Sequence, residues 1–133
     1  IKVESMEDAC TNMDTISLHI PLNDKTKNII NYDLLKTMKN NCIIINAARG
    51  GIVNEVDLDR ALKEDLIFGA GLDVFETEPP EANNPLLKND KVFLSPHTAA
   101  FTEECMTRMG KETVQNIIDF FDEKLEKSKI VKL

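Results

Sequence analysis

The sequence predicts an α/β fold built on a parallel β-sheet, and two observations carry this prediction. Short apolar runs alternate along the 133 residues with polar segments of helical spacing. The runs are nearly continuous in hydrophobic residues, which is typical of parallel strands covered by helices on both faces. Alternating strands and helices then imply right-handed crossovers between successive strands. The predicted strands lie within residues 15–20, 42–48, 67–74 and 92–95.

Each predicted helix begins at a residue suited to cap it. The capping side chain accepts a hydrogen bond from a backbone N–H of the first turn. In the third helix, apolar residues recur every three or four positions, so one stripe can lie on the sheet. The last helix is the longest, and it carries Glu103 and Glu104 where the helix dipole favours anions. The predicted caps are Ser5, Asn31 and Asn54, and the last helix is predicted to open at Thr102.

Composition and charge exclude several classes of partner. The 16 Lys and Arg residues against 23 Asp and Glu residues give a formal net charge of −7. This balance argues against nucleic acid and anionic membranes, which both attract basic surfaces. The hydrophobic content of 42% is ordinary for a globular domain, and no apolar run is long enough to span a bilayer. We therefore expect a cytoplasmic protein with no nucleic-acid or membrane partner.

The three cysteines do not form a metal-ligand pattern. Cys10, Cys42 and Cys105 are far apart in the sequence, and no second cysteine or histidine stands at zinc-ligand spacing. Free thiols in a reducing compartment fit this arrangement best. We expect no metal site.

Candidate ligand-binding residues follow the second and third apolar runs. In an open parallel sheet, ligands bind beyond the carboxyl ends of the strands. Arg49 follows the second run, and Gly50 and Gly51 permit a sharp turn there. Its guanidinium can bind a substrate carboxylate through two hydrogen bonds, although an ion pair with a surface acid is the alternative. Asp73 follows the third run and could hold a cofactor or cap its own loop.

A candidate acid–base pair comes from the next two loops. Glu76 and Glu78 stand near Pro79 and Pro80, which stiffen their loop, and His97 follows the fourth run. Histidine has an ordinary pKa of ~6.5, nearest to neutrality, and a carboxylate beside it fixes the ring tautomer. Taken singly, Glu78 could be a solvated acid and His97 a loop residue. The second histidine, His19, is expected to be a packed core residue.

Together, the three candidate side chains could carry out one reaction. Arg49 would hold the carboxylate and carbonyl of a 2-oxo acid, and His97 would give a proton to the carbonyl oxygen as a hydride arrives. The carboxylate of Glu76 or Glu78 would stabilise the charged imidazole. The reverse reaction oxidises a 2-hydroxy acid. Because no side chain carries a hydride, a nicotinamide cofactor is required.

Three ordered motifs carry a resemblance to a known family. They are NAARGGIVNE at residues 46–55, GLDVFETEP at 71–79 and SPHTAA at 95–100. The set resembles the carboxyl half of the nucleotide-binding domain of NAD-dependent D-isomer-specific 2-hydroxyacid dehydrogenases, closest to the phosphoglycerate dehydrogenase branch. The resemblance covers nearly the whole chain. It implies a partial Rossmann-like, doubly wound sheet, NAD as cofactor and a small 2-hydroxy or 2-oxo acid as substrate.

The resemblance also implies roles for single residues. Arg49 would bind substrate, Glu78 would pair with His97, and His97 would be the general acid and base. Asp73 would contact the nicotinamide end. Ile20 stands where many relatives carry Thr. The implied cofactor-binding residues are Ile20, Ala47, Ala48, Arg49, Asp73, His97, Thr98, Ala99 and Ala100.

The sequence lacks parts that the family carries. None of the five glycines forms the G-x-G-x-x-G turn of a dinucleotide-binding fold. We therefore expect a fragment: residues 1–112 as the carboxyl half of the NAD-binding domain, and 113–133 as a return helix and tail toward an absent substrate domain. Such a fragment should turn over poorly or not at all. It should also self-associate, as a homodimer or larger species, to cover an exposed sheet face.

Several alternatives stay open from the sequence. Glyoxylate and hydroxypyruvate reductases share the three motifs, and non-catalytic NAD-sensing corepressors of the same superfamily keep similar ones. A purely structural or dimerising piece is a further alternative. NAD and NADP are not distinguished, because the residue that recognises the adenosine ribose is not in the chain.

Overall fold

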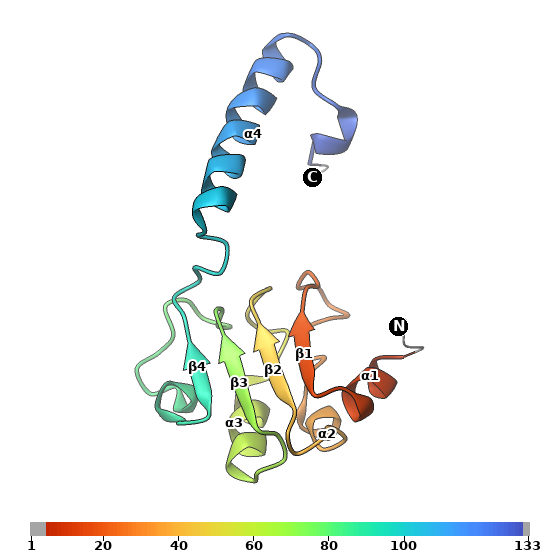
Figure 1. The fold of residues 1–133 in the computed structure, drawn as a ribbon, viewed down its shortest axis with the longest axis vertical. Helices are drawn as coiled ribbons and strands as arrows, with labels where there is room; N and C mark the ends of the chain where they lie inside the picture. Colours follow the sequence, from red (N-terminus) through yellow and green to blue (C-terminus); the bar gives the residue numbers. More distant parts are fainter. Residues whose placement is uncertain (1–4, 132–133) are drawn as a thin grey trace. The chain divides into compact units, whose positions relative to one another are not determined.

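The computed structural model describes residues 5–131, and the chain divides into two compact units between Thr98 and Ala99. The first unit contains a four-stranded sheet with helices, and the second contains a long helix and a short 3-10 turn (Figure 1). The strands are β1 (Thr15–Leu18), β2 (Ile43–Asn46), β3 (Gly69–Leu72) and β4 (Val92–Leu94).

The sheet is parallel throughout, with strand order β1-β2-β3-β4. Its register aligns Leu18, Asn46, Leu72 and Leu94, which are the last residues of the four strands. The predicted α/β fold with four parallel strands is confirmed. Each strand is shorter than its apolar run, because both ends of the longer runs belong to loops.

The helices begin where the capping residues predict. The first unit contains α1 (Met6–Asn12), α2 (Tyr32–Leu35), α3 (Glu55–Lys63) and η1 (Pro85–Lys88), and the second contains α4 (Glu103–Phe121) and η2 (Lys127–Lys129). The three predicted caps and the predicted start of the last helix at Thr102 are confirmed. Ser5, Asn31, Asn54 and Thr102 accept from the backbone N–H of Asp8, Leu34, Asp57 and Cys105, respectively.

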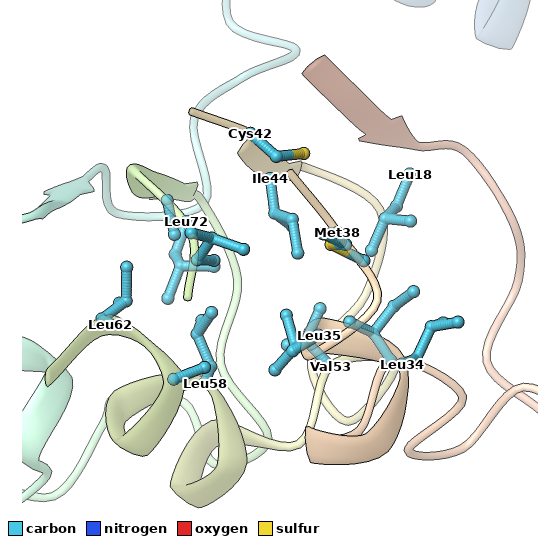
Figure 2. Packing of buried hydrophobic residues seen from close by; sticks show 14 of the residues in the cluster. Leu18, Leu34, Leu35, Met38, Cys42, Ile44, Val53, Leu58, Leu62 and Leu72 are labelled. Carbon is cyan, nitrogen blue, oxygen red and sulfur yellow. The ribbon is translucent and has the colours of Figure 1, made fainter. Parts of the chain in front are cut away.

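One hydrophobic core lies between the sheet and α1, α2 and α3 (Figure 2). Leu18, Ile44 and Leu72 reach it from the strands, and Leu35 and Leu58 reach it from the helices. Along the chain, each new strand is added at the same edge of the sheet, next to the strand before it. Because right-handed crossovers in a constant direction leave their helices on the same side, α2 and α3 share one face of the sheet, and α1, which precedes β1, joins the same core through Cys10.

The opposite face of the sheet is open among the described residues of the first unit. Ile45 is 38% exposed and Phe93 is 77% exposed. A hollow of ≈ 890 Å³ lies along this face, and Gly69 and Gly71 leave it without side chains on β3. Within this unit the described helices therefore cover one face of the sheet, and the open face agrees with the exposed sheet face expected of a fragment. A continuous apolar run shows that both faces are apolar, but not that both are covered.

The second unit presents an amphipathic helix. α4 has none of its residues buried, and its apolar side chains include the exposed Met106, Ile117 and Phe121. The boundary predicted at residue 112 lies inside α4, and the assignment of the segment after it to a second domain stays a prediction. Over residues 5–131, no helix is both long and apolar enough to cross a membrane.

The cysteines and His19 lie in contrasting environments. Cys10 and Cys42 are buried free thiols, and burial raises the pKa of Cys10 to about 11. Cys105 is a half-buried free thiol. The expectation that His19 packs in the core is wrong. Because β1 ends at Leu18, His19 lies exposed beyond the sheet, with its Nε2 2.8 Å from Ser17 Oγ.

Candidate active site

The predicted site residues of the first unit follow the carboxyl ends of its four strands. Ala47 and Asp73 directly follow β2 and β3, Ile20 lies two residues after β1, and His97 three after β4. The strands are parallel and end in register, so these positions leave the sheet at one edge (Figure 1). This is the edge at which open α/β sheets bind ligands.

Glu78 and His97 form a hydrogen-bonded pair at this edge, which is an ion pair when the imidazole is protonated. His97 Nδ1 lies 2.8 Å from Glu78 Oε2. The other carboxylate oxygen, Oε1, accepts the backbone N–H of Phe75 at 3.0 Å. These bonds, first the one from His97 and then the one from Phe75, lower the pKa of Glu78. The carboxylate is therefore ionised at neutral pH, and because Nδ1 faces Glu78, Nε2 is the ring nitrogen on the side away from the carboxylate.

Asp73 holds the loop that carries His97. Its Oδ1 accepts Ser95 Oγ at 2.5 Å and the backbone N–H of Thr98 at 2.8 Å, so these bonds flank His97. The φ of His97 is 55°, in the left-handed region that a side chain adopts only when its surroundings enforce it. Asp73 is buried, and this geometry supports its loop-capping alternative. Contact with nicotinamide stays a prediction.

The loop after β2 is shaped by Asn46, which the sequence analysis did not single out. Its side chain is 2% exposed and makes two bonds within the loop. Nδ2 donates to the carbonyl of Arg49 at 2.9 Å, and Oδ1 accepts the N–H of Ala48 at 3.1 Å. An Asn at the end of an apolar run was the available signal, because a buried amide needs partners. Arg49 is exposed, and its Nη1 donates to the Ala48 carbonyl at 2.6 Å.

Gly50 brings the Arg49 loop against the loop that carries Glu78. A Cβ built on Gly50 would lie 1.8 Å from the carbonyl oxygen of Phe75. Only glycine fits so close to another backbone. Phe75 in turn donates its N–H to Glu78, which pairs with His97. The structure thus brings Glu78 and His97 into contact and places Arg49 in the adjoining loop.

A hollow of ≈ 370 Å³ adjoins the ion pair. Its size falls within the usual range for sites that bind small organic molecules. Asp73 and Ser95 line it beside the ion pair, and the remaining wall is mostly apolar. The other lining residues are Phe75, Pro79, Pro80, Leu87, Leu94 and Pro96.

The other predicted cofactor residues offer small or apolar surfaces. Ile20 and Ala47 are exposed, whereas Ala48 is half-buried. Ala99 and Ala100 belong to the second unit, where both are exposed. Small or apolar side chains at the strand ends leave room for a flat, partly apolar ring, so the residues of the first unit are compatible with a pyridine nucleotide.

Comparison with known proteins identifies the family. Residues 1–99 match the family described as D-isomer specific 2-hydroxyacid dehydrogenase, NAD binding domain. The chain is 45% identical over 115 residues to D-3-phosphoglycerate dehydrogenase of Methanocaldococcus jannaschii, covering 86% of this chain and 22% of that protein. It is 44% identical over 107 residues to glyoxylate reductase of Korarchaeum cryptofilum, covering 80% and 32%.

A solved structure with a similar fold supports the same family. D-lactate dehydrogenase with NAD+ from Lactobacillus jensenii has a TM-score of 0.87 and 29% sequence identity, covering 98% of this chain and 43% of that one. The chain spans 22% to 37% of the length of such curated relatives. The fold, the family match and these relatives agree, and the chain belongs to the D-isomer specific 2-hydroxyacid dehydrogenases, as part of their NAD-binding domain.

Proposed function

We propose that the chain is the carboxyl half of the NAD-binding domain of a dehydrogenase similar to phosphoglycerate dehydrogenase. Its reaction transfers a hydride between nicotinamide and a 2-hydroxy or 2-oxo acid. The observation that carries the proposal is the 2.8 Å pair of Glu78 and His97 at the carboxyl edge of the sheet. A carboxylate that orients an imidazole beside a ligand-sized hollow suits proton transfer to and from a substrate oxygen.

In the direction of reduction, NADH held at the strand ends would supply the hydride that the carbonyl carbon of the 2-oxo acid needs. The protonated imidazole of His97 gives its Nε2 proton to the carbonyl oxygen, and the product is the 2-hydroxy acid. Glu78 stabilises the imidazolium before the transfer and keeps Nδ1 protonated afterwards. In the direction of oxidation, neutral His97 accepts the hydroxyl proton at Nε2.

Arg49 binds the carboxylate of the substrate. Its planar guanidinium presents paired donors, which match the two oxygens of a carboxylate. Binding would exchange the present bond to the Ala48 carbonyl for bonds to substrate. Asn46 fixes the backbone at Arg49, so this exchange requires only side-chain rotation.

The cofactor is held at the strand ends. Ile20, Ala47 and Ala48 would line it after β1 and β2, and Thr98 after β4. Asp73, Ala99 and Ala100 stay proposed cofactor residues on the strength of the family resemblance. Bound nicotinamide must lie beside the substrate carbonyl, so the substrate is expected at the same edge as the Glu78–His97 pair.

Substrate choice has a second candidate. Relatives named glyoxylate reductase and hydroxypyruvate reductase are as similar to this chain, at 44% identity each, as the phosphoglycerate dehydrogenase relative at 45%. Reduction of glyoxylate or hydroxypyruvate is therefore the alternative activity. All of these substrates are small acids whose carboxylate Arg49 could bind.

Location and assembly complete the proposal. The free thiols suit a reducing compartment such as the cytoplasm. The open apolar face of the sheet favours self-association as a homodimer or larger species. We expect the 133-residue chain alone to oxidise NADH slowly or not at all with these acids. Brisk oxidation would contradict that expectation.

A chimaera tests the proposed function. The matching segment of the Methanocaldococcus jannaschii relative is replaced by this chain, and NADH formation from D-3-phosphoglycerate is measured. We expect an active chimaera that loses at least about a hundredfold in kcat on His97→Gln. His19→Gln is the matched control, because His19 is the other histidine and is also exposed near the strand ends. A folded chimaera whose activity survives His97→Gln would refute the assignment.

A further inference from the structure

The carboxylate of Glu55 holds the loop that carries Glu78 through two hydrogen bonds. Glu55 Oε1 accepts the backbone N–H of Glu76 at 2.6 Å, and its Oε2 accepts Nδ2 of Asn84 at 2.6 Å. These partners lie on either side of Glu78 in the sequence. The residues between them form neither helix nor strand, so no regular backbone ladder fixes this stretch.

The base of this attachment is rigid. Glu55 is the first residue of α3, whose Leu58, Ala61 and Leu62 are buried in the core. Asn84 is fixed as well, because its Oδ1 accepts the N–H of Leu86 at the start of η1. Hydrogen bonds to an ionised carboxylate are about twice as strong as neutral ones.

The peptide group between Phe75 and Glu76 is held from two sides. Its carbonyl, from Phe75, lies against Gly50, and its N–H, from Glu76, donates to Glu55. The N–H of Phe75 itself donates to Glu78. Phe75 therefore makes two of these contacts, its carbonyl against Gly50 and its N–H to Glu78, and so links the held peptide group to the carboxylate that meets His97.

The two bonds use both oxygens of the Glu55 carboxylate. Glu76, whose N–H donates to one of these oxygens, also pairs through its own carboxylate with Lys27 at 3.3 Å. The chain on the Glu76 side of Glu78 is therefore held at two points.

We propose that Glu55 is a positioning residue for the acid–base pair: by tying Glu76 and Asn84 to α3, it sets Glu78 in place against His97. The catalytic meaning of this role rests on the proposed function. The positioning itself is a property of the chain without substrate or cofactor, and it can be measured separately.

The test uses NMR on the 133-residue chain with no ligand added. In Glu55→Ala, we expect the Glu76 amide to exchange about tenfold faster, because it loses a charge-assisted bond. We also expect the pKa of Glu78 to rise toward its ordinary value, read from its carboxyl 13C titration. The groups that set this titration are His97, the Phe75 N–H and the charge of Asp73.

Matched variants decide the outcome. Glu81→Ala removes an exposed acid from the same loop and should leave both measurements unchanged. Glu55→Gln keeps one acceptor oxygen, so it should give intermediate values, and it decides the question if Glu55→Ala does not fold. An unchanged Glu78 titration in the folded variant would overturn the proposal. Failure of the proposed function would appear only in the chimaera assay, so the two failures are distinguishable.

Discussion

Gly50→Ala should separate the two loops that build the site. The new Cβ would lie 1.8 Å from the Phe75 carbonyl oxygen, 2.0 Å from its carbon and 2.5 Å from the Glu76 nitrogen. Cβ atoms essentially never approach another atom within 3.0 Å, so the loops must part by at least 3.0 − 1.8 = 1.2 Å. All three atoms are backbone, and no flexible side chain can yield in their place.

The displacement predicts two measurable losses. Forcing an extra carbon into a packed site costs about 1–3 kcal/mol of unfolding free energy, which urea denaturation followed by circular dichroism would measure. A shift of about 1 Å between catalytic groups costs roughly a hundredfold in rate. We therefore expect kcat/KM of the chimaera to fall about a hundredfold, because Arg49 moves relative to Glu78.

Gly110→Ala is the control for this experiment. Gly110 lies within α4, and nothing lies within 4 Å of a Cβ built there. Alanine in a helix interior is favoured over glycine by about 0.5–1 kcal/mol, so this variant should be slightly more stable. If Gly50→Ala matched the wild type in both stability and turnover, the close packing of the two loops would not be what builds the site.

Three further perturbations probe the ion pair, the His97 loop and the open face. The pKa of Glu78 is lowered from 4.5 in the folded chain, so the stability that its charge contributes is present above pH 4.5 and is lost as pH falls through the lowered value. As the pH is lowered from above 4.5 through the pKa of Glu78, the difference in urea midpoint between the wild type and Glu78→Gln should shrink. A difference that stays constant over this pH range would contradict this reasoning. Asp73→Ala leaves Ser95 Oγ and the Thr98 N–H without their acceptor and should cost about 1–3 kcal/mol in urea unfolding, whereas a cost near zero would show that Asp73 does not hold the loop. Phe93→Lys places a charge on the open face at a residue that is 77% exposed, so light scattering should report a smaller species at nearly unchanged stability; a wild-type monomer would refute self-association through this face.

Local patterns predicted the framework of the site well. Capping at Asn54 depends on contacts within three residues, which the sequence shows directly. The position of His97 beyond β4 follows from the rule that parallel strands end at one edge. The residues alone left Glu76 and Glu78 as candidate partners, and the family resemblance singled out Glu78, which the structure pairs with His97.

The attachments between loops could not be predicted in the same way. In the sequence, Glu55 is an acid in the first turn of a predicted helix, and the helix dipole alone explains an acid at this position. Its partners Glu76 and Asn84 are 21 and 29 residues away, and only the fold brings them together. Asn46 is similar, since its apolar neighbours indicate a strand residue and conceal its role in the following loop.

The connection from β2 to α3 links the two halves of the site. Arg49, which would bind the substrate carboxylate, stands next to Gly50, and Gly50 packs against the backbone of Phe75. Glu55 is the last residue of the same motif, and its carboxylate accepts the backbone N–H of Glu76. The substrate-binding residue and the residue that positions Glu78 are therefore set by one short stretch of backbone. A change at Gly50 or Glu55 acts on the same peptide group, so its effect should reach both the binding of the acid and the transfer of the proton. The motif at residues 46–55 thus has a physical reason to occur as a unit: its residues fix one another's loops across the edge of the sheet.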